Sequence, residues 1–175
     1  LIVDVQNDFC PGGALAIKNG DAVIPVLNPW MWNAVSVDIP VYASRDWHPK
    51  GHNSFSEQGG PWPPHCIQDS EGARFHLALE QPDSVIKVTK GVRFDQDQNS
   101  VFDKTGLAVE LHKKDIKRLW VGGLAQDVCV LASVLDGQKE GFEIILIKDA
   151  TRPVTPEGGE EALKKMRDAG IKIFS

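Results

Sequence analysis

Six short hydrophobic runs are spread along the chain, and each of them stops at polar residues or at glycine. Runs of this length with many Val, Ile and Leu residues are typical of strands that are buried on both faces of a parallel sheet. We therefore expect strands at residues 1–3, 41–44, 85–88, 119–121, 143–147 and 171–174.

Segments with helical spacing of their hydrophobic residues separate these runs. The last one has Pro156 near its start and Gly170 just past its end, which is the usual asymmetry of a helix. Strands that alternate with helices predict a parallel sheet covered on both faces. The predicted fold is one α/β domain over residues 1–175, a Rossmann-like three-layer α/β/α arrangement with a six-stranded, mostly parallel sheet. The expected helices are residues 20–32, 107–113, 127–140 and 156–169.

Residues 45–68 follow no regular period and are crowded with His, Trp, Pro and Gly. A structureless segment of this length inside a compact domain is uncommon unless it is functional. A second polar stretch, residues 92–104, is also expected to be a loop. The first loop is therefore the place to look for binding residues.

The composition excludes several classes of protein. With 42% hydrophobic and 25% charged residues the chain is an ordinary globular protein, and its net charge of −5 offers no basic surface to a nucleic acid. No hydrophobic run approaches the length of a membrane span, and no signal peptide precedes the first strand. The chain starts inside that strand, so we expect further residues before it. Three cysteines cannot all pair, which favours a reducing, cytoplasmic location.

Polar residues whose side chains could take part in catalysis or metal binding follow four of the predicted strands. Asp4 follows the first strand, Asp46 and His48 the second, Lys90 the third, and Cys129 comes one turn after the fourth. Because the carboxyl ends of parallel strands meet at one edge of a sheet, we expect these five side chains to lie close together.

Cys129 lies just inside the start of a predicted helix. The positive end of the helix dipole favours a thiolate there, which makes this cysteine a candidate nucleophile. Asp4 is a candidate acceptor for the thiol proton, and the ammonium group of Lys90 would stabilise the thiolate. The alternatives are a free cysteine packed as a small apolar residue and a structural ion pair between Asp4 and Lys90.

Three of the five histidines fall in the 45–68 loop beside an aspartate. Imidazoles together with a carboxylate suit a divalent transition metal such as Zn, Mn or Fe. The alternative is a polar loop whose histidines bond only to nearby backbone. Phe9 and Trp62 flank these candidates in the sequence and offer stacking partners for a flat ring, unless they are ordinary packing residues. The candidate ligands are Asp46, His48, His52 and His65.

Five motifs follow one another along the chain: LIVDVQNDFCPGG, SRDWHPKGHNSF, GGPWPPHC, TKG and GGLAQDVCV. Together they resemble the nicotinamidase branch of the isochorismatase-like cysteine hydrolases, and the similarity extends over essentially the whole chain. No single motif is specific, but five of them in this order are.

The resemblance implies a catalytic triad of Asp4, Lys90 and Cys129. It also implies one divalent metal ion, with zinc the first choice, and His52 matches a position that some relatives use as a further ligand. The ligands carried over from the family are Asp46, His48 and His65.

The family pattern implies further features near the nucleophile. A cis peptide bond is expected between Leu124 and Ala125, and the amides of Ala125 and Cys129 would form an oxyanion hole. The expected contacts of the substrate are Phe9, Trp62 and Leu124.

The activity implied by the resemblance is hydrolysis of nicotinamide to nicotinate and ammonia through a thioester, within NAD salvage. One alternative is another member of the same group, such as an N-carbamoyl amidase or an isochorismatase, but these lack the Asp-x-His and distant His ligand set. A second alternative is a catalytically silent binding module on this fold. The presence of all three triad residues argues against it.

Three places differ from the family pattern or read unusually. Asn99 stands where many relatives carry a tyrosine, and Val128 where they often carry a larger residue, so both predict a wider pocket. Residues 30–32 read Trp-Met-Trp. If this stretch is exposed it indicates a subunit contact and a homo-oligomer, whereas a buried stretch is core.

Overall fold

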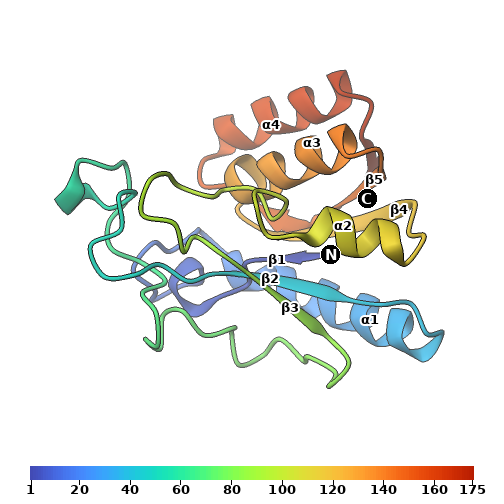
Figure 1. The fold of residues 1–175 in the computed structure, drawn as a ribbon, viewed down its shortest axis with the longest axis horizontal. Helices are drawn as coiled ribbons and strands as arrows, with labels where there is room; N and C mark the ends of the chain where they lie inside the picture. Colours follow the sequence, from blue (N-terminus) through green and yellow to red (C-terminus); the bar gives the residue numbers. More distant parts are fainter.

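The computed structural model describes residues 1–175 and contains one six-stranded sheet with the order β3-β2-β1-β4-β5-β6 (Figure 1). Every pair of neighbouring strands is parallel, so the predicted α/β fold is confirmed. The strands are β1 (Ile2–Val3), β2 (Tyr42–Asp46), β3 (Ile86–Lys90), β4 (Arg118–Leu124), β5 (Glu143–Arg152) and β6 (Lys172–Phe174).

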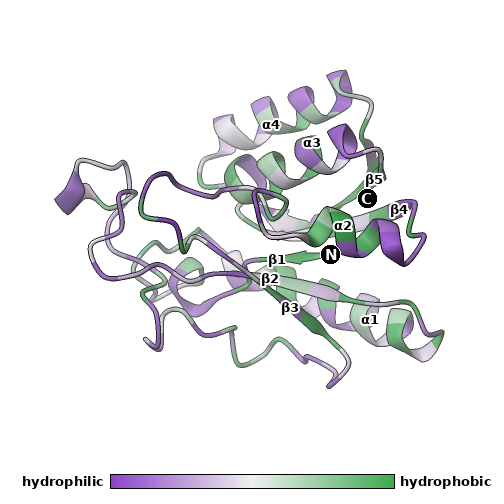
Figure 2. Cartoon of the chain, viewed as in Figure 1, coloured by the Kyte–Doolittle hydropathy of each residue, from purple (hydrophilic) through white to green (hydrophobic).

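Helices cover both faces of the sheet. One hydrophobic cluster joins α1 to one face, and a second cluster joins α2, α3 and α4 to the other. The two successive residues of β1 belong to different clusters, Ile2 to the first and Val3 to the second, as the two-residue period of a strand requires. Figure 2 shows hydrophobic and hydrophilic residues alternating along α3 and α4, which is typical of helices with one buried side. The helices are α1 (Ile24–Ser36), α2 (Leu107–Lys113), α3 (Leu131–Lys139) and α4 (Pro156–Asp168).

The strand order reverses between β1 and β4, because the chain moves outward in one direction through β2 and β3 and in the other through β5 and β6. In open α/β sheets ligands bind at such a switch point, outside the carboxyl ends of the strands. The long loops gather at this end of the sheet, on the left of Figure 1. The topology therefore marks the crevice beyond β1 and β4 as the place for a site.

Several elements extend differently from the prediction. Strands β2 and β3 continue to Asp46 and Lys90, and β5 continues to Arg152, five residues beyond its predicted end. The predicted helix 20–32 is a 3-10 turn, η2 (Gly20–Val23), followed by α1, whose first turn contains Pro25. The predicted helix 127–140 is divided into a π-helical turn, η4 (Gln126–Val130), and α3. Two short 3-10 turns, η1 (Asn7–Phe9) and η3 (Ser56–Gln58), lie in the loops.

The Trp-Met-Trp stretch belongs mainly to the core. Met31 is buried, and the ring of Trp30 packs against that of Trp120 at a centroid distance of 4.9 Å. Trp32 is 48% exposed, and its indole N–H donates to Glu80. None of the helices is both long enough and apolar enough to cross a membrane.

Gly123 fills a position that no other residue fits. Its φ is +126°, and a Cβ atom built there would overlap the backbone of Val3 on the neighbouring strand. We expect Gly123→Ala to lower the free energy of unfolding by more than about 2 kcal/mol. Gly141→Ala is the matched control, because Gly141 also has a positive φ but open space around it, so only the backbone cost of about 1–2 kcal/mol applies. Urea denaturation would measure both, and an equal loss would contradict the steric argument.

Candidate active site

Four of the predicted residues come together at the switch point. Asp4 directly follows β1, Asp46 and Lys90 are the last residues of β2 and β3, and Cys129 lies in the π-helical turn after β4. Asp46 and Lys90 are register partners in neighbouring strands, which fixes them side by side. The expected gathering of these side chains at one edge of the sheet is therefore what the structure contains.

Lys90 is the centre of this group. Its Nζ lies 2.7 Å from Asp4 Oδ2, 2.6 Å from Asp46 Oδ1 and 3.5 Å from Cys129 Sγ. All four residues are buried, and Lys90 and Asp4 are fully so. A single ammonium group thus joins two carboxylates and a thiol away from bulk water.

Burial and these contacts set the charge states of the group. Burial lowers the pKa of Lys90, but the charges of Asp4 and Asp46 outweigh it, so the net pKa is well above its usual value and the ammonium persists. Burial also raises the pKa of Asp46, yet Lys90 and His48 hold that pKa well below its usual range. For Asp4 the burial effect prevails over Lys90, and the pKa is raised.

The thiol itself is not in the state that the helix dipole alone would give. Burial raises the pKa of Cys129 well above its usual value, with Lys90 acting in the opposite direction and Asp4 adding to the rise. The resting side chain is therefore a thiol beside a carboxylate of raised pKa. The raised pKa of Asp4 makes this carboxylate a better acceptor for the thiol proton than a free carboxylate would be.

Three of the predicted metal ligands form a compact donor set. Ligand atoms of Asp46, His48 and His65 all lie within 4.8 Å of one another, and all three residues are buried. Nδ1 of His48 lies 2.8 Å from the carbonyl oxygen of Gly91, and Nδ1 of His65 lies 2.8 Å from that of Pro63. Carbonyl oxygens only accept, so each Nδ1 carries its proton and each Nε2 keeps a free lone pair. These residues fit a divalent metal ion.

His52 lies beside this set rather than in it. Its ring stacks on that of His48 at 4.3 Å, and its Nδ1 is 2.8 Å from Ser54 Oγ. The buried Nε2 of His52 has no partner, and a second donor group consists of His48, His52 and Asp97. His48 belongs to both donor groups, so the predicted further ligand His52 lies next to the first group. Asp97 is a candidate metal ligand that the sequence reasoning missed.

A small pocket opens beside the donor set and the thiol. Phe9 and Trp62 line it, together with Val128 and Asn99. Leu124 does not line it: this side chain is fully buried in the core cluster that includes α1. A contact between Leu124 and the substrate stays a prediction, which this pocket lining does not support. The lining consists of Phe9, Leu15, Ala16, Ile17, Asp46, His48, Trp62, His65, Asp97, Asn99, Ala125, Val128, Cys129 and Val154.

The backbone near the thiol has two notable features. The peptide bond between Leu124 and Ala125 is cis, as expected. The amide of Ala125 donates no hydrogen bond, while its carbonyl accepts from Val128 and Val130. Cys129 lies in the π-helical turn that directly follows Ala125.

Ser44 is another residue that sequence reasoning missed. Its hydroxyl donates to Asp4 Oδ1 at 2.6 Å, and this residue is also fully buried. Ser44 stands two residues before Asp46 in the same strand, so the strand period places both side chains on one face. That spacing was the available signal.

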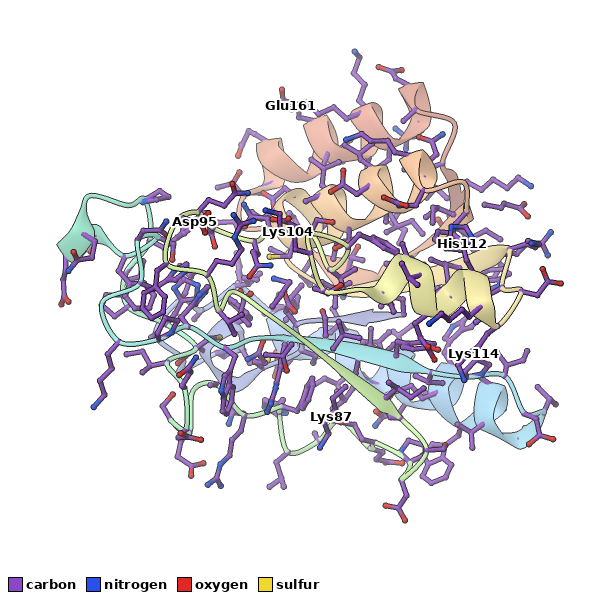
Figure 3. All side chains as sticks on the ribbon, viewed as in Figure 1. Lys87, Asp95, Lys104, His112, Lys114 and Glu161 are labelled. Atoms are coloured by element: carbon purple, nitrogen blue, oxygen red, sulfur yellow. The ribbon has the colours of Figure 1, made fainter.

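Many charged side chains outside the site lie at the surface of the molecule. Labelled side chains such as Lys87, Lys114 and Glu161 lie around the periphery in Figure 3. The site is thus set apart by burial of its charges rather than by their number. A doubly wound parallel sheet with a thiol, an ammonium group and a carboxylate buried at its switch point contains the groups that the class of cysteine-dependent hydrolases requires.

Comparisons with known proteins are consistent with this class. The family model described as "Isochorismatase domain" matches residues 1–175. Nicotinamidase of Escherichia coli is 37% identical, over 100% of this chain and 93% of the relative. Pyrazinamidase of Pyrococcus horikoshii in complex with zinc is 41% identical with a TM-score of 0.96, covering 99% of this chain and 96% of the other. PnC1 from L. infantum in complex with nicotinate is 37% identical with a TM-score of 0.90, covering 99% and 90%.

The match over the full chain settles the family. This protein belongs to the isochorismatase family.

Proposed function

We propose that this protein is a metal-dependent cysteine amidohydrolase that converts nicotinamide to nicotinate and ammonia, with its single domain over residues 1–175 carrying the whole site. The observation that carries the proposal is the position of Lys90 Nζ between Asp4, Asp46 and the Cys129 thiol. The similarity to the E. coli nicotinamidase and to the L. infantum protein with bound nicotinate supports this substrate. The reaction returns nicotinamide to NAD salvage.

The first half of the proposed mechanism forms a thioester. Asp4 takes the proton of the Cys129 thiol, and Sγ attacks the carboxamide carbon. The amides of Ala125 and Cys129 donate to the oxygen as it becomes negative. When the intermediate collapses, the C–N bond breaks and Asp4 returns its proton to the leaving nitrogen, which departs as ammonia.

The second half releases the acid. Asp4 takes a proton from water, whose oxygen attacks the thioester carbon, and the C–S bond breaks. The sulfur of Cys129 recovers the proton from Asp4, and nicotinate leaves. Lys90 remains charged throughout and stabilises both the thiolate and the ionised form of Asp4.

Asp46, His48 and His65 would hold the metal ion, which we propose to be zinc because two imidazoles and one carboxylate suit it and because the P. horikoshii relative was solved with zinc. When bound there, the ion supplies a Lewis acid that orients the pyridine ring and withdraws electron density from it. The carboxylate of Asp46 belongs to both the catalytic group and the metal-ligand set, since Oδ1 contacts Lys90 Nζ and Oδ2 lies 3.6 Å from His48 Nε2.

The walls of the pocket account for recognition of a flat ring. Phe9 and Trp62 offer aromatic surfaces, and Val128 is a small neighbour of the nucleophile. Asn99, whose Oδ1 lies 3.9 Å from Cys129 Sγ, stands exposed at the pocket. We expect ring-substituted pyridine carboxamides to be accepted alongside nicotinamide.

Removal of the metal tests the proposal directly. We expect dialysis against a chelator to reduce ammonia release from nicotinamide at least about tenfold, because without the ion the pyridine ring is neither oriented nor depleted of electron density. Added Zn²⁺, Mn²⁺ or Fe²⁺ should restore the rate. Full activity of protein shown by metal analysis to be metal-free would refute the ligand assignment.

The same assay separates the alternatives. An N-carbamoyl amino acid and isochorismate serve as substrates for the two related activities, and we expect neither to be turned over at a rate near that of nicotinamide. Absence of ammonia release from every carboxamide, with intact metal and thiol, would favour the silent binding module.

A further inference from the structure

The segment that follows β1 is largely buried and carries three polar side chains into the interior. Asp4, Val5 and Gln6 are fully buried and Asp8 is 9% exposed, whereas Asn7 bonds to the backbone of Glu71 nearer the surface. The catalytic mechanism uses only Asp4. The functions of Gln6 and Asp8 are therefore open.

Gln6 clamps the backbone of a proposed metal ligand. Its Oε1 accepts from the amide N–H of Asp46 at 2.8 Å, and its Nε2 donates to the carbonyl oxygen of Asp46, also at 2.8 Å. The second hydrogen of Nε2 is donated to the carbonyl oxygen of Ala73 at 2.8 Å. Both backbone groups of Asp46 thus depend on one side chain, and buried groups left without it would carry a desolvation cost.

Asp8 makes the corresponding contacts on the other ligand segment. Its Oδ2 accepts from the amide N–H of Cys66, the residue after His65, at 2.7 Å. Its Oδ1 accepts from the N–H of Ala14 at 3.0 Å, next to the pocket residue Leu15. A Cβ atom on Gly72 would overlap this carboxylate, so Asp8 is closely enclosed.

These contacts fix the two ligand segments to the segment that carries the catalytic base. The ligand segments also bond directly to each other, since His48 N–H donates to Cys66 O at 2.9 Å and Gln68 N–H to His48 O at 2.9 Å. Nothing in that direct pairing sets their position relative to Asp4. Gln6 and Asp8 do so, because they stand two and four residues from Asp4 in one short segment.

We propose that Gln6 and Asp8 are positioning residues of the metal site, which hold the Asp46 and His65 segments in register with Asp4 and the thiol. The inference rests on the proposed function, since it assumes that Asp46, His48 and His65 bind a metal ion. It predicts that both residues control metal affinity and ligand geometry without touching the metal or the substrate.

The test compares Gln6→Leu, Asp8→Asn and the matched control Asn7→Ala with the wild type. Metal-free proteins are titrated with Zn²⁺ against a chromogenic chelator, and with Co²⁺, whose visible spectrum reports the ligand field. We expect Zn²⁺ affinity to fall roughly 10–100-fold in Gln6→Leu, and less in Asp8→Asn, which keeps one acceptor oxygen. The Co²⁺ bands should change in both, while Asn7→Ala matches the wild type.

Thermal unfolding of the metal-free proteins shows whether each variant is folded at the titration temperature. If Gln6→Leu is not folded, the Zn²⁺ affinity and Co²⁺ spectrum of Asp8→Asn test the inference. Unchanged affinity and Co²⁺ spectra in folded variants would overturn the inference, as would an equal loss in Asn7→Ala. A wild type that binds neither Zn²⁺ nor Co²⁺ would instead refute the metal site of the proposed function.

Discussion

Replacement of Cys129 by alanine is expected to abolish ammonia release from nicotinamide, with a loss of at least about 10⁴-fold in kcat/KM. Sγ is the only atom in the pocket that can form the thioester, and neither Lys90, held by two carboxylates, nor Asp4, held by Lys90 and Ser44, replaces it. The substitution removes one buried atom, so the protein should stay folded. A coupled ammonia assay measures the rate, and circular dichroism and thermal unfolding check the fold.

Cys10→Ala is the matched control for this experiment. Cys10 is equally buried, its pKa is raised to about 11, mainly by burial, and it lies in the core outside the pocket lining. We expect its removal to leave the rate within about twofold. Turnover above one hundredth of the wild-type rate in Cys129→Ala would identify another nucleophile and reject the proposed chemistry.

The edge of the sheet where the site lies was predictable because strand direction alone determines it. Hydrophobic runs marked the strands, and polar residues that follow parallel strands meet at one end whatever the strand order. What the runs could not give was register. The pairing of Asp46 with Lys90 depends on backbone hydrogen bonds between β2 and β3, and neither the buried β2 nor the largely exposed edge strand β3 has an alternation that specifies it.

The state of the thiol could not be predicted because it depends on burial. A helix dipole contributes about 0.3–1 kcal/mol near a terminus, whereas full burial shifts a pKa by several units. Cys129 lies in a π-helical turn and is 6% exposed, so burial decides. The sequence indicated a helix start but carried no information on the layer of loops that covers it.

Leu124 shows a different limit of motif-based reasoning. It precedes Ala125 in the motif and was expected to contact the substrate. In β4 its side chain points to the face that α1 covers, where it belongs to the core cluster with Leu27. Ala125, just past the end of β4, belongs to the same core cluster but also lines the pocket, so adjacency in a motif does not place two side chains in one pocket.

The second large effect is expected for Asp4→Asn, which should remain folded and lose at least about 10³-fold in kcat. Asparagine has nearly the same shape and can still accept the Ser44 hydroxyl, and Lys90 keeps its partner Asp46. The amide, however, can neither accept the thiol proton nor deliver one to the leaving nitrogen. Asp127→Asn is the control, because that carboxylate lies two residues from Cys129 but accepts from the N–H of Val154, and we expect less than a tenfold change.

Alkylation of Cys129 by iodoacetamide at several pH values distinguishes loss of the base from loss of the thiolate. The negative charge of Asp4 raises the pKa of the Cys129 thiol, so its removal should move the midpoint of alkylation to lower pH. Catalysis is then lost although the thiolate forms more easily, which is the result expected when Asp4 carries the proton between thiol and ammonia. A midpoint moved to higher pH would mean that Asp4 acts mainly by stabilising the thiolate, and turnover within tenfold of the wild type would assign the base to another residue.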